Sequence, residues 1–122
     1  MFTSACVVGT GRVGQALAGR LGERIPTWTT GRELDGLDAE LVLLCVPDTA
    51  ISEVAKVVPP GPWIAHTSGA CRLSALDPHE RRFSIHPLQT FQLGLGPEQL
   101  DGSWAAISGE SAEAIAAARG LA

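Results

Sequence analysis

Glycines at a fixed spacing form the clearest chemical pattern near the start of the sequence. Residues 9–14 read Gly-Thr-Gly-Arg-Val-Gly, which is the pattern G-x-G-x-x-G. They directly follow the apolar run 5–8 and open a segment whose apolar residues recur at helical spacing. In that setting the first glycine makes a tight turn, the second lets the backbone approach a pyrophosphate, and the third lets helix and strand pack closely. The pattern predicts a dinucleotide site formed by Gly9, Thr10, Gly11, Arg12, Val13 and Gly14. A glycine turn that holds no ligand is the alternative.

The end of the next predicted strand, the short β-prone run 27–30, bears on the type of dinucleotide. Domains that prefer NAD usually carry Asp or Glu about 20 residues beyond the glycines, where it binds the ribose hydroxyls. Here the run ends Thr29-Thr30-Gly31-Arg32, and small hydroxyl side chains followed by arginine suit a 2′-phosphate. We therefore expect NADP(H) rather than NAD(H), with Thr30 and Arg32 as ligands. Two alternatives stay open: Glu33 as the ribose ligand, and a solvated loop position for Arg32.

Histidine follows two of the later apolar runs, as His66 and His86. We expect both at the carboxyl ends of strands, the edge where open α/β sheets bind their ligands. In hydride transfer the cofactor carries the difficult step and the protein supplies orientation and a proton, for which histidine is suited because it titrates near neutrality. We therefore select His86 as the candidate acid or base. The alternative is a structural role, in which His86 caps a strand end and bonds to a neighbouring loop.

An alternative interpretation of the residues at this edge is a catalytic zinc site, with His66, Cys71 and His86 as its three protein ligands. No two of these residues have a short motif spacing on one helix or turn, so we expect no metal site. The three cysteines are far apart, odd in number and without a C-x-x-C pair, which is typical of reduced thiols in a cytosolic protein.

Strands and helices are predicted to alternate along the chain, as in a parallel α/β sheet. We expect strands at 5–8, 27–30, 41–46, 63–66, 83–85 and 104–107, helices at 12–21, 49–57 and 111–119, and a long loop at 88–103. The continuous apolar run 41–46 fits a central strand that is covered on both faces. The predicted fold class is α/β: a doubly wound, mostly parallel six-stranded sheet of the Rossmann type.

The sequence also predicts structural roles for an aspartate and for the tryptophans. Asp48 is expected to cap the helix that follows it, a contribution of about 1 kcal/mol. The tryptophans are expected in the core, because they lie within or at the start of strands. They are Trp28, Trp63 and Trp104.

Length and charge exclude several classes of partner. The chain has 122 residues, the size of one domain. Its net charge is −4 and Lys56 is its single lysine. Nucleic acid is not an expected partner, because phosphate contacts need clustered Lys and Arg. The apolar start is too short for a signal peptide and no run approaches transmembrane length, so we expect a cytoplasmic protein without a membrane partner.

Four segments together resemble one known family: residues 7–14, 43–48, 66–70 and 85–91. From about residue 5 to residue 109 the chain resembles the N-terminal domain of the Rossmann-like and DUF2520 domain-containing proteins. More widely, it is similar to the 6-phosphogluconate dehydrogenase-like superfamily, which includes pyrroline-5-carboxylate reductases and prephenate dehydrogenases. Many families share the glycine motif, whereas Val-Pro-Asp at 46–48 and His-Pro-Leu-Gln-Thr-Phe at 86–91 are more specific.

The resemblance implies an NAD(P)-dependent oxidoreductase domain that acts on a small carbonyl, imine or hydroxy substrate. It implies that Val46, Pro47 and Asp48 line the cofactor beside the nicotinamide ribose. It further implies that Ser68 orients the substrate and that His86 corresponds to the catalytic histidine of prephenate dehydrogenases.

In relatives, an all-helical C-terminal domain dimerises and closes the substrate pocket. We expect residues 1–122 to form one dinucleotide-binding domain without that helical domain, so that the chain is a fragment or is completed by a partner. Turnover by this chain alone is then not expected. A non-catalytic dinucleotide sensor or scaffold is the alternative function, and the identity of the substrate and a homodimer stay open.

Overall fold

The computed structural model describes residues 2–9, 11–31, 38–59, 61–68, 71–87 and 105–121. Its strands are β1 (Ala5–Val8), β2 (Thr27–Thr30), β3 (Leu41–Leu44), β4 (Trp63–His66), β5 (Arg82–Pro87) and β6 (Ala105–Gly109). Its helices are α1 (Arg12–Gly22), α2 (Asp48–Val57) and α3 (Ala112–Leu121), with a short 3₁₀ helix, η1 (Leu73–Leu76). Each predicted strand and helix is present, with ends shifted by a few residues, whereas the sequence did not indicate η1. The predicted loop at 88–103 and Trp104 lie outside the described residues.

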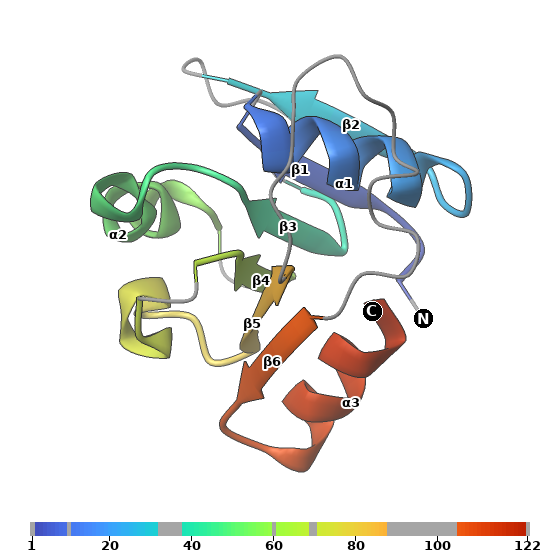
Figure 1. Ribbon diagram of the computed structural model, residues 1–122. Coiled ribbons are helices and arrows are strands. Elements are labelled where there is room, and N and C mark those ends of the chain that lie inside the picture. The colour runs from blue at the N-terminus through green and yellow to red at the C-terminus, as the bar shows by residue number, and fades with distance from the viewer. Residues whose placement is uncertain are drawn as a thin grey trace.

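The strands form one sheet in the order β2-β1-β3-β4-β5-β6 (Figure 1). All pairings are parallel except that of β5 with β6, which is antiparallel. After β2 the chain returns to the other side of β1 to form β3. This reversal is the topological switch point at which open α/β sheets bind ligands. The predicted class, a doubly wound and mostly parallel Rossmann-type sheet, is confirmed.

Helices cover both faces of the sheet (Figure 1). One apolar cluster joins alternate strand residues to Leu17 and Leu21 of α1 and to Ala114 and Ala118 of α3. The other cluster joins the intervening strand residues to α2 and to Leu76 of η1. We refer to these as the α1/α3 face and the α2/η1 face. Because both faces are covered, all four residues of β3 are fully buried, which explains the continuous apolar run there.

The expectation for the tryptophans is confirmed at one position and wrong at another. Trp63 is buried and packs against Phe83 on the α1/α3 face. Trp28 is 37% exposed, because it lies on β2, which is an edge strand among the strands that the structure describes. A strand pattern in the sequence does not distinguish an edge strand from a central one.

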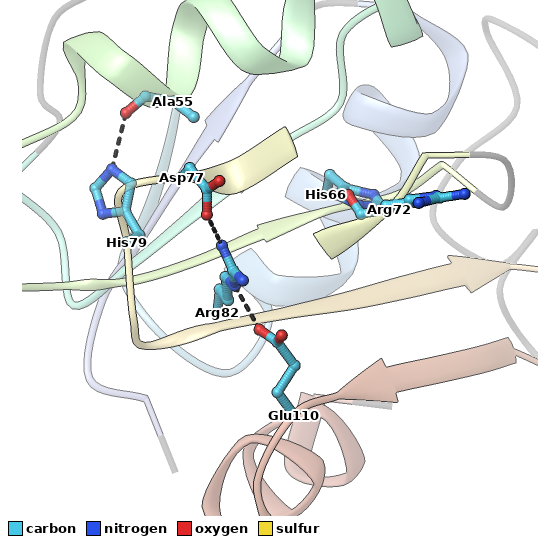
Figure 2. Close-up of polar contacts among 7 residues, drawn as sticks. All are labelled: Ala55, His66, Arg72, Asp77, His79, Arg82 and Glu110. Atoms are coloured by element: carbon cyan, nitrogen blue, oxygen red, sulfur yellow. Dashed lines mark hydrogen bonds and ion pairs between the residues drawn. The ribbon is translucent and has the colours of Figure 1, made fainter. Parts of the chain in front are cut away.

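Arg82, on β5, connects this strand to η1 and to β6 through ion pairs. Its guanidinium group forms an ion pair with Asp77, just beyond η1, and another with Glu110, just beyond β6, at 2.6 Å (Figure 2). This hydrogen-bonded ion pair with Arg82 lowers the pKa of Glu110 below its ordinary value. A carboxyl group whose pKa is lower in the folded state stabilises the fold above its ordinary pKa, and that stabilisation is lost as the pH falls through the folded pKa.

We predict that Glu110→Gln flattens the acid limb of the stability curve. Below about pH 5 the wild-type free energy of unfolding should fall more steeply than that of the variant, because only the wild type must protonate a paired carboxylate. Urea unfolding at several pH values, at low salt, measures this slope. Glu53→Gln, an exposed change on α2, should leave the slope unchanged. Identical acid limbs for wild type and Glu110→Gln would contradict the prediction.

Candidate active site at the carboxyl edge of the sheet

The residues that the sequence singled out gather along one edge of the sheet. Strands β1 to β5 run parallel, so their carboxyl ends lie side by side. From the strand order, the sites follow one another along this edge as Thr30, the glycine turn, residues 46–48, Ser68 and His86. Three strand spacings, about 14 Å, separate the glycine turn after β1 from His86 on β5. An extended ligand is therefore needed to reach from one to the other.

The glycine turn packs its backbone directly against Cys45, the residue that follows β3. Gly9 has φ +118°, which favours glycine, and a Cβ there would lie 2.2 Å from the Cys45 carbonyl oxygen. The Gly9 N–H donates to the Thr30 carbonyl at 2.9 Å, and the Cys45 N–H donates to the Val8 carbonyl at 2.8 Å. The turn is thus tied to the ends of the strands on both sides of β1.

The third glycine lets α1 begin close to this turn. A Cβ at Gly14 would lie 2.4 Å from the Gly9 carbonyl oxygen. Gly11 differs from both other glycines. It precedes the first residue of α1, has φ −77°, and a Cβ there would meet nothing within 4 Å among the described residues. Among the described residues, the turn therefore leaves space at the amino end of a helix, where backbone N–H groups and the helix dipole favour an anion.

Other predicted cofactor residues are placed around the turn. Arg12 is exposed at the first position of α1, and Val13 packs partly against the α1/α3 face. Thr30 is buried at the tip of β2 beside Gly9. Thr10 and Arg32 lie outside the described residues.

Residues 46–48 connect β3 to α2. Val46 packs partly against the α2/η1 face, and Pro47 and Asp48 are exposed. The expectation that Asp48 caps the helix is wrong: Pro47 occupies the N-cap position, no side chain caps the helix, and Asp48 is its first residue. There its negative charge still interacts favourably with the amino end of the helix dipole.

His66 is fully buried at the end of β4 and holds the loop that follows it. Its Nδ1 accepts a hydrogen bond from the Ser68 N–H at 3.1 Å, so the ring proton is on Nε2. Nε2–H donates to the Arg72 carbonyl at 3.3 Å (Figure 2). Burial lowers the pKa of His66, while the Arg72 carbonyl and the charge of Asp48 act in the opposite direction. A neutral ring with both nitrogens engaged makes His66 a structural residue rather than a zinc ligand.

Ser68 lies at the turn that His66 holds. Its Oγ accepts a hydrogen bond from the Cys71 N–H at 3.1 Å. The sequence indicated Ser68 only through the family resemblance, and the structure brings it to the same pocket as His86.

His86, near the end of β5, contacts the same loop from the neighbouring strand. Its Nδ1–H donates to the Thr67 carbonyl at 2.8 Å. This is the contact with a neighbouring loop that the structural interpretation of His86 predicts. It also fixes which nitrogen carries the proton in the neutral ring, since Nε2 is then the lone-pair nitrogen. Nε2 is the atom that can accept or return a proton.

Cys45 lies between the glycine turn and the β4 loop. Burial raises the pKa of its thiol to about 12, and a hydrogen bond with the Thr67 side chain acts in the opposite direction. At neutral pH the sulfur is therefore a protonated thiol rather than a nucleophilic thiolate. Thr67, which the sequence analysis did not select, thus contacts both Cys45 and His86. All three cysteines are free thiols.

A pocket of about 200 Å³ opens beside His86. Its lining comes from the loop after β4, from the α2/η1 side of β5 and from β6. Within the described ranges, no group of three or more His, Cys, Asp and Glu side chains is placed to hold a metal ion. No helix in the described part of the chain is long and apolar enough to cross a membrane.

The chain is similar to solved structures over nearly its full length. It superposes on prephenate dehydrogenase from A. aeolicus, in complex with hydroxyphenyl propionate and NAD+, with a TM-score of 0.79 and 12% identity over 99% of this chain and 56% of that one. A protein assigned as an NADP oxidoreductase from Bacteroides fragilis gives a TM-score of 0.77 and 18% identity, over 98% of this chain and 56% of that one. Synechocystis arogenate dehydrogenase gives 0.72 and 17%, over 97% of this chain and 55% of that one. No family model matches the chain, and no curated protein matches it.

These likenesses define the class of the domain. At 12–18% identity they show the fold, a Rossmann-type α/β domain with the topology found in these dehydrogenases. The chain spans a little over half the length of the solved structures that it matches.

We predict that the three glycines respond differently to alanine. Gly9→Ala and Gly14→Ala should each lower the free energy of unfolding by about 1–3 kcal/mol, because the new Cβ would overlap a backbone oxygen. Gly11→Ala should stay within about 0.5 kcal/mol of the wild type, because its Cβ enters open space and its φ suits any residue. Urea unfolding monitored by circular dichroism compares the three variants. An equal loss at all three positions would contradict this packing.

Proposed function

We propose that this chain binds a nicotinamide dinucleotide along the carboxyl edge of its sheet, as the cofactor domain of an NAD(P)-dependent oxidoreductase. Gly11 is the observation that carries the proposal. A turn without a ligand needs glycine at positions 9 and 14, where backbone packs on backbone. It does not need glycine at position 11, where φ is ordinary and nothing lies within 4 Å of a Cβ among the described residues. Close approach of a pyrophosphate explains a glycine there.

The order of the candidate residues along the edge supports the same function. The adenosine end of the dinucleotide would lie at Thr30, its pyrophosphate at the glycine turn, and its nicotinamide at Val46–Asp48. The substrate would then lie beside Ser68 and His86 on the next two strands. The bound nicotinamide would supply hydride chemistry.

We further propose that NADP(H) is preferred. No acidic side chain lies at the tip of β2, where Thr30 holds the Gly9 N–H through its carbonyl. Arg32, two residues further on, would bind the 2′-phosphate. The similar structures do not favour one dinucleotide, because one contains NAD+ and another is assigned as an NADP oxidoreductase. The proposed preference for NADP(H) therefore depends on the residues of this chain alone.

In the proposed reaction, His86 holds or delivers the proton through Nε2 while Nδ1 stays bonded to Thr67. Ser68 orients the substrate through its hydroxyl. We propose membership of the Rossmann-like and DUF2520 domain-containing family, from the motifs at 46–48 and 86–91. A helical second domain would complete the substrate pocket, as that resemblance implies.

The first test of the function is a titration with NADPH and with NADH, followed by tryptophan fluorescence. We expect saturable binding, tighter for NADPH, and its loss in Gly11→Val, because a branched side chain would occupy the space of the pyrophosphate. Circular dichroism checks that the variant stays folded. Binding of NADH alone would refute the NADP(H) preference, and binding of neither by the folded wild type would refute the cofactor domain.

A second prediction concerns the proton carried by His86. In His86→Asn the amide N–H₂ replaces Nδ1–H as the donor to Thr67, whereas no group replaces Nε2. We expect the Kd for NADPH to stay within about twofold and kcat to fall by about 10²–10⁴. The measurement is oxidation of NADPH by small carbonyl or imine compounds, with the helical domain present. Unchanged kcat would exclude His86 as the acid or base, and cofactor binding without any turnover would favour a sensor.

A further inference from the structure

Thr67 contacts two other residues at the edge of the sheet, one through its side chain and one through its backbone. A hydrogen bond joins its side chain to the Cys45 thiol. Its carbonyl accepts the hydrogen bond from Nδ1–H of His86 at 2.8 Å. Cys45 follows β3, Thr67 follows β4 and His86 lies on β5, three strands that are neighbours in the sheet (Figure 1). The proposed function uses the contact with His86 but gives no role to the contact with Cys45.

Strand pairing alone does not fix the position of Thr67. The pairing of β4 with β3 ends at His66, and its pairing with β5 ends at His66 and Ser84. Thr67 is the first residue beyond both pairings. The loop is held one residue further along, where the Ser68 N–H donates to the ring of His66 at 3.1 Å. The side chain of Thr67 adds a restraint on the residue whose own carbonyl contacts His86.

Cys45 is a firmly held partner for the Thr67 side chain. The Cys45 N–H donates to the Val8 carbonyl at 2.8 Å. The Cys45 carbonyl oxygen lies so close to Gly9 that a Cβ there would be 2.2 Å from it, and the Cβ of Cys45 would be 3.4 Å from a Cβ at Gly14. Cys45 is therefore packed against the glycine turn on one side and bonded to Thr67 on the other.

The hydrogen bond runs from the Thr67 hydroxyl to the Cys45 sulfur. This bond acts to lower the pKa of Cys45, which a hydrogen bond does when it stabilises the thiolate, and a thiolate can only accept. Burial has the larger effect and raises that pKa to about 12, so the sulfur stays a protonated thiol, which is still a weak acceptor. Because threonine is branched at Cβ and stiff at χ1, a bond to its hydroxyl also restrains the adjacent backbone.

We infer that Thr67 is a positioning residue for His86: its hydroxyl, bonded to the Cys45 thiol, holds in place the carbonyl that keeps the ring proton on Nδ1. Nε2 then stays the lone-pair nitrogen of the neutral ring. This inference rests on the proposed function, in which Nε2 of His86 holds or delivers the proton. Because Cys45 also packs against Gly9, one series of contacts connects the glycine turn to His86.

The tautomer of His86 is the direct test of this inference. It is measured by NMR on protein with ¹⁵N-labelled histidine rings at about pH 8.5, above the ordinary pKa range of histidine. His86→Asn assigns the signals. We expect the Nδ1–H form in the wild type and in Thr67→Ser, which keeps the hydroxyl. Thr67→Val has a similar shape without the hydroxyl and should show both tautomers.

A matched control removes a threonine hydroxyl elsewhere in the sheet. The Thr27 hydroxyl, at the amino end of β2, donates to the Ile25 carbonyl at 3.0 Å. Thr27→Val should therefore leave the His86 tautomer as in the wild type. Circular dichroism checks that each variant is folded.

Cys45→Ala tests the same bond from its other end, and decides the matter if Thr67→Val does not fold. We expect it to give the mixture of tautomers seen in Thr67→Val, and the double variant to give no more than either single one, because both act through one bond. For a compound that the wild type reduces with the helical domain present, Thr67→Val should lower kcat by about 10–10²-fold and leave the Kd for NADPH within about twofold. Thr67→Ser should restore kcat.

A fully Nδ1–H ring in folded Thr67→Val would overturn the inference, because the carbonyl would then hold His86 without help from the hydroxyl. An unchanged tautomer in Cys45→Ala would overturn it as well, since the thiol would not be the partner that matters. The tautomer is measured without any cofactor. Failure of the wild type to bind a dinucleotide would therefore refute the proposed function while the NMR result still decides whether Thr67 positions the ring.

Discussion

Direct packing of backbone on backbone, where β1 turns into α1, is the constraint on which the candidate site depends. The Gly9 turn lies against the Cys45 carbonyl at the end of β3, and α1 begins against the Gly9 carbonyl at Gly14. Any side chain at either position would push α1 away from the sheet. Because α1 begins so close, its amino end faces the switch point between β1 and β3, where Gly11 leaves open space. These two steric contacts thereby fix both the position of the helix and the position of the proposed anion site.

Two histidines with different chemistry hold the loop after β4. His66 is buried and neutral, and its two ring nitrogens bind the backbone at Ser68 and Arg72. His86 reaches the same loop from β5 through Nδ1 alone, so its structural contact and the proposed proton transfer use different nitrogens. The structural and catalytic interpretations of His86 are therefore compatible. The pocket exists because β5 and this loop are tied together at that point.

Much of the fold could be predicted from local patterns. Apolar or β-prone runs predicted the strands and helical spacing predicted the helices. The run 41–46 was the clearest of them, because a strand buried on both faces must be apolar throughout. Features that depend on distant partners could not be predicted. Exposure of Trp28 follows from the edge position of β2, and the uncapped start of α2 follows from the path of residues 46–48. The structural role of His66 depends on the Arg72 carbonyl, six residues further along the chain.

The sequence by itself determined which chemical groups are available for the proposed site at this edge. A glycine pattern between a strand and a helix, and histidines after later strands, are local features that any reader of the chain can find. Only the tertiary structure decided which of these residues lie together, because the strand order places Ser68, His86 and Arg72 around one pocket and leaves His66 inside the protein. The reason is physical: residue type fixes what a side chain can do, whereas burial and neighbours contributed by other strands fix whether it is free to do it.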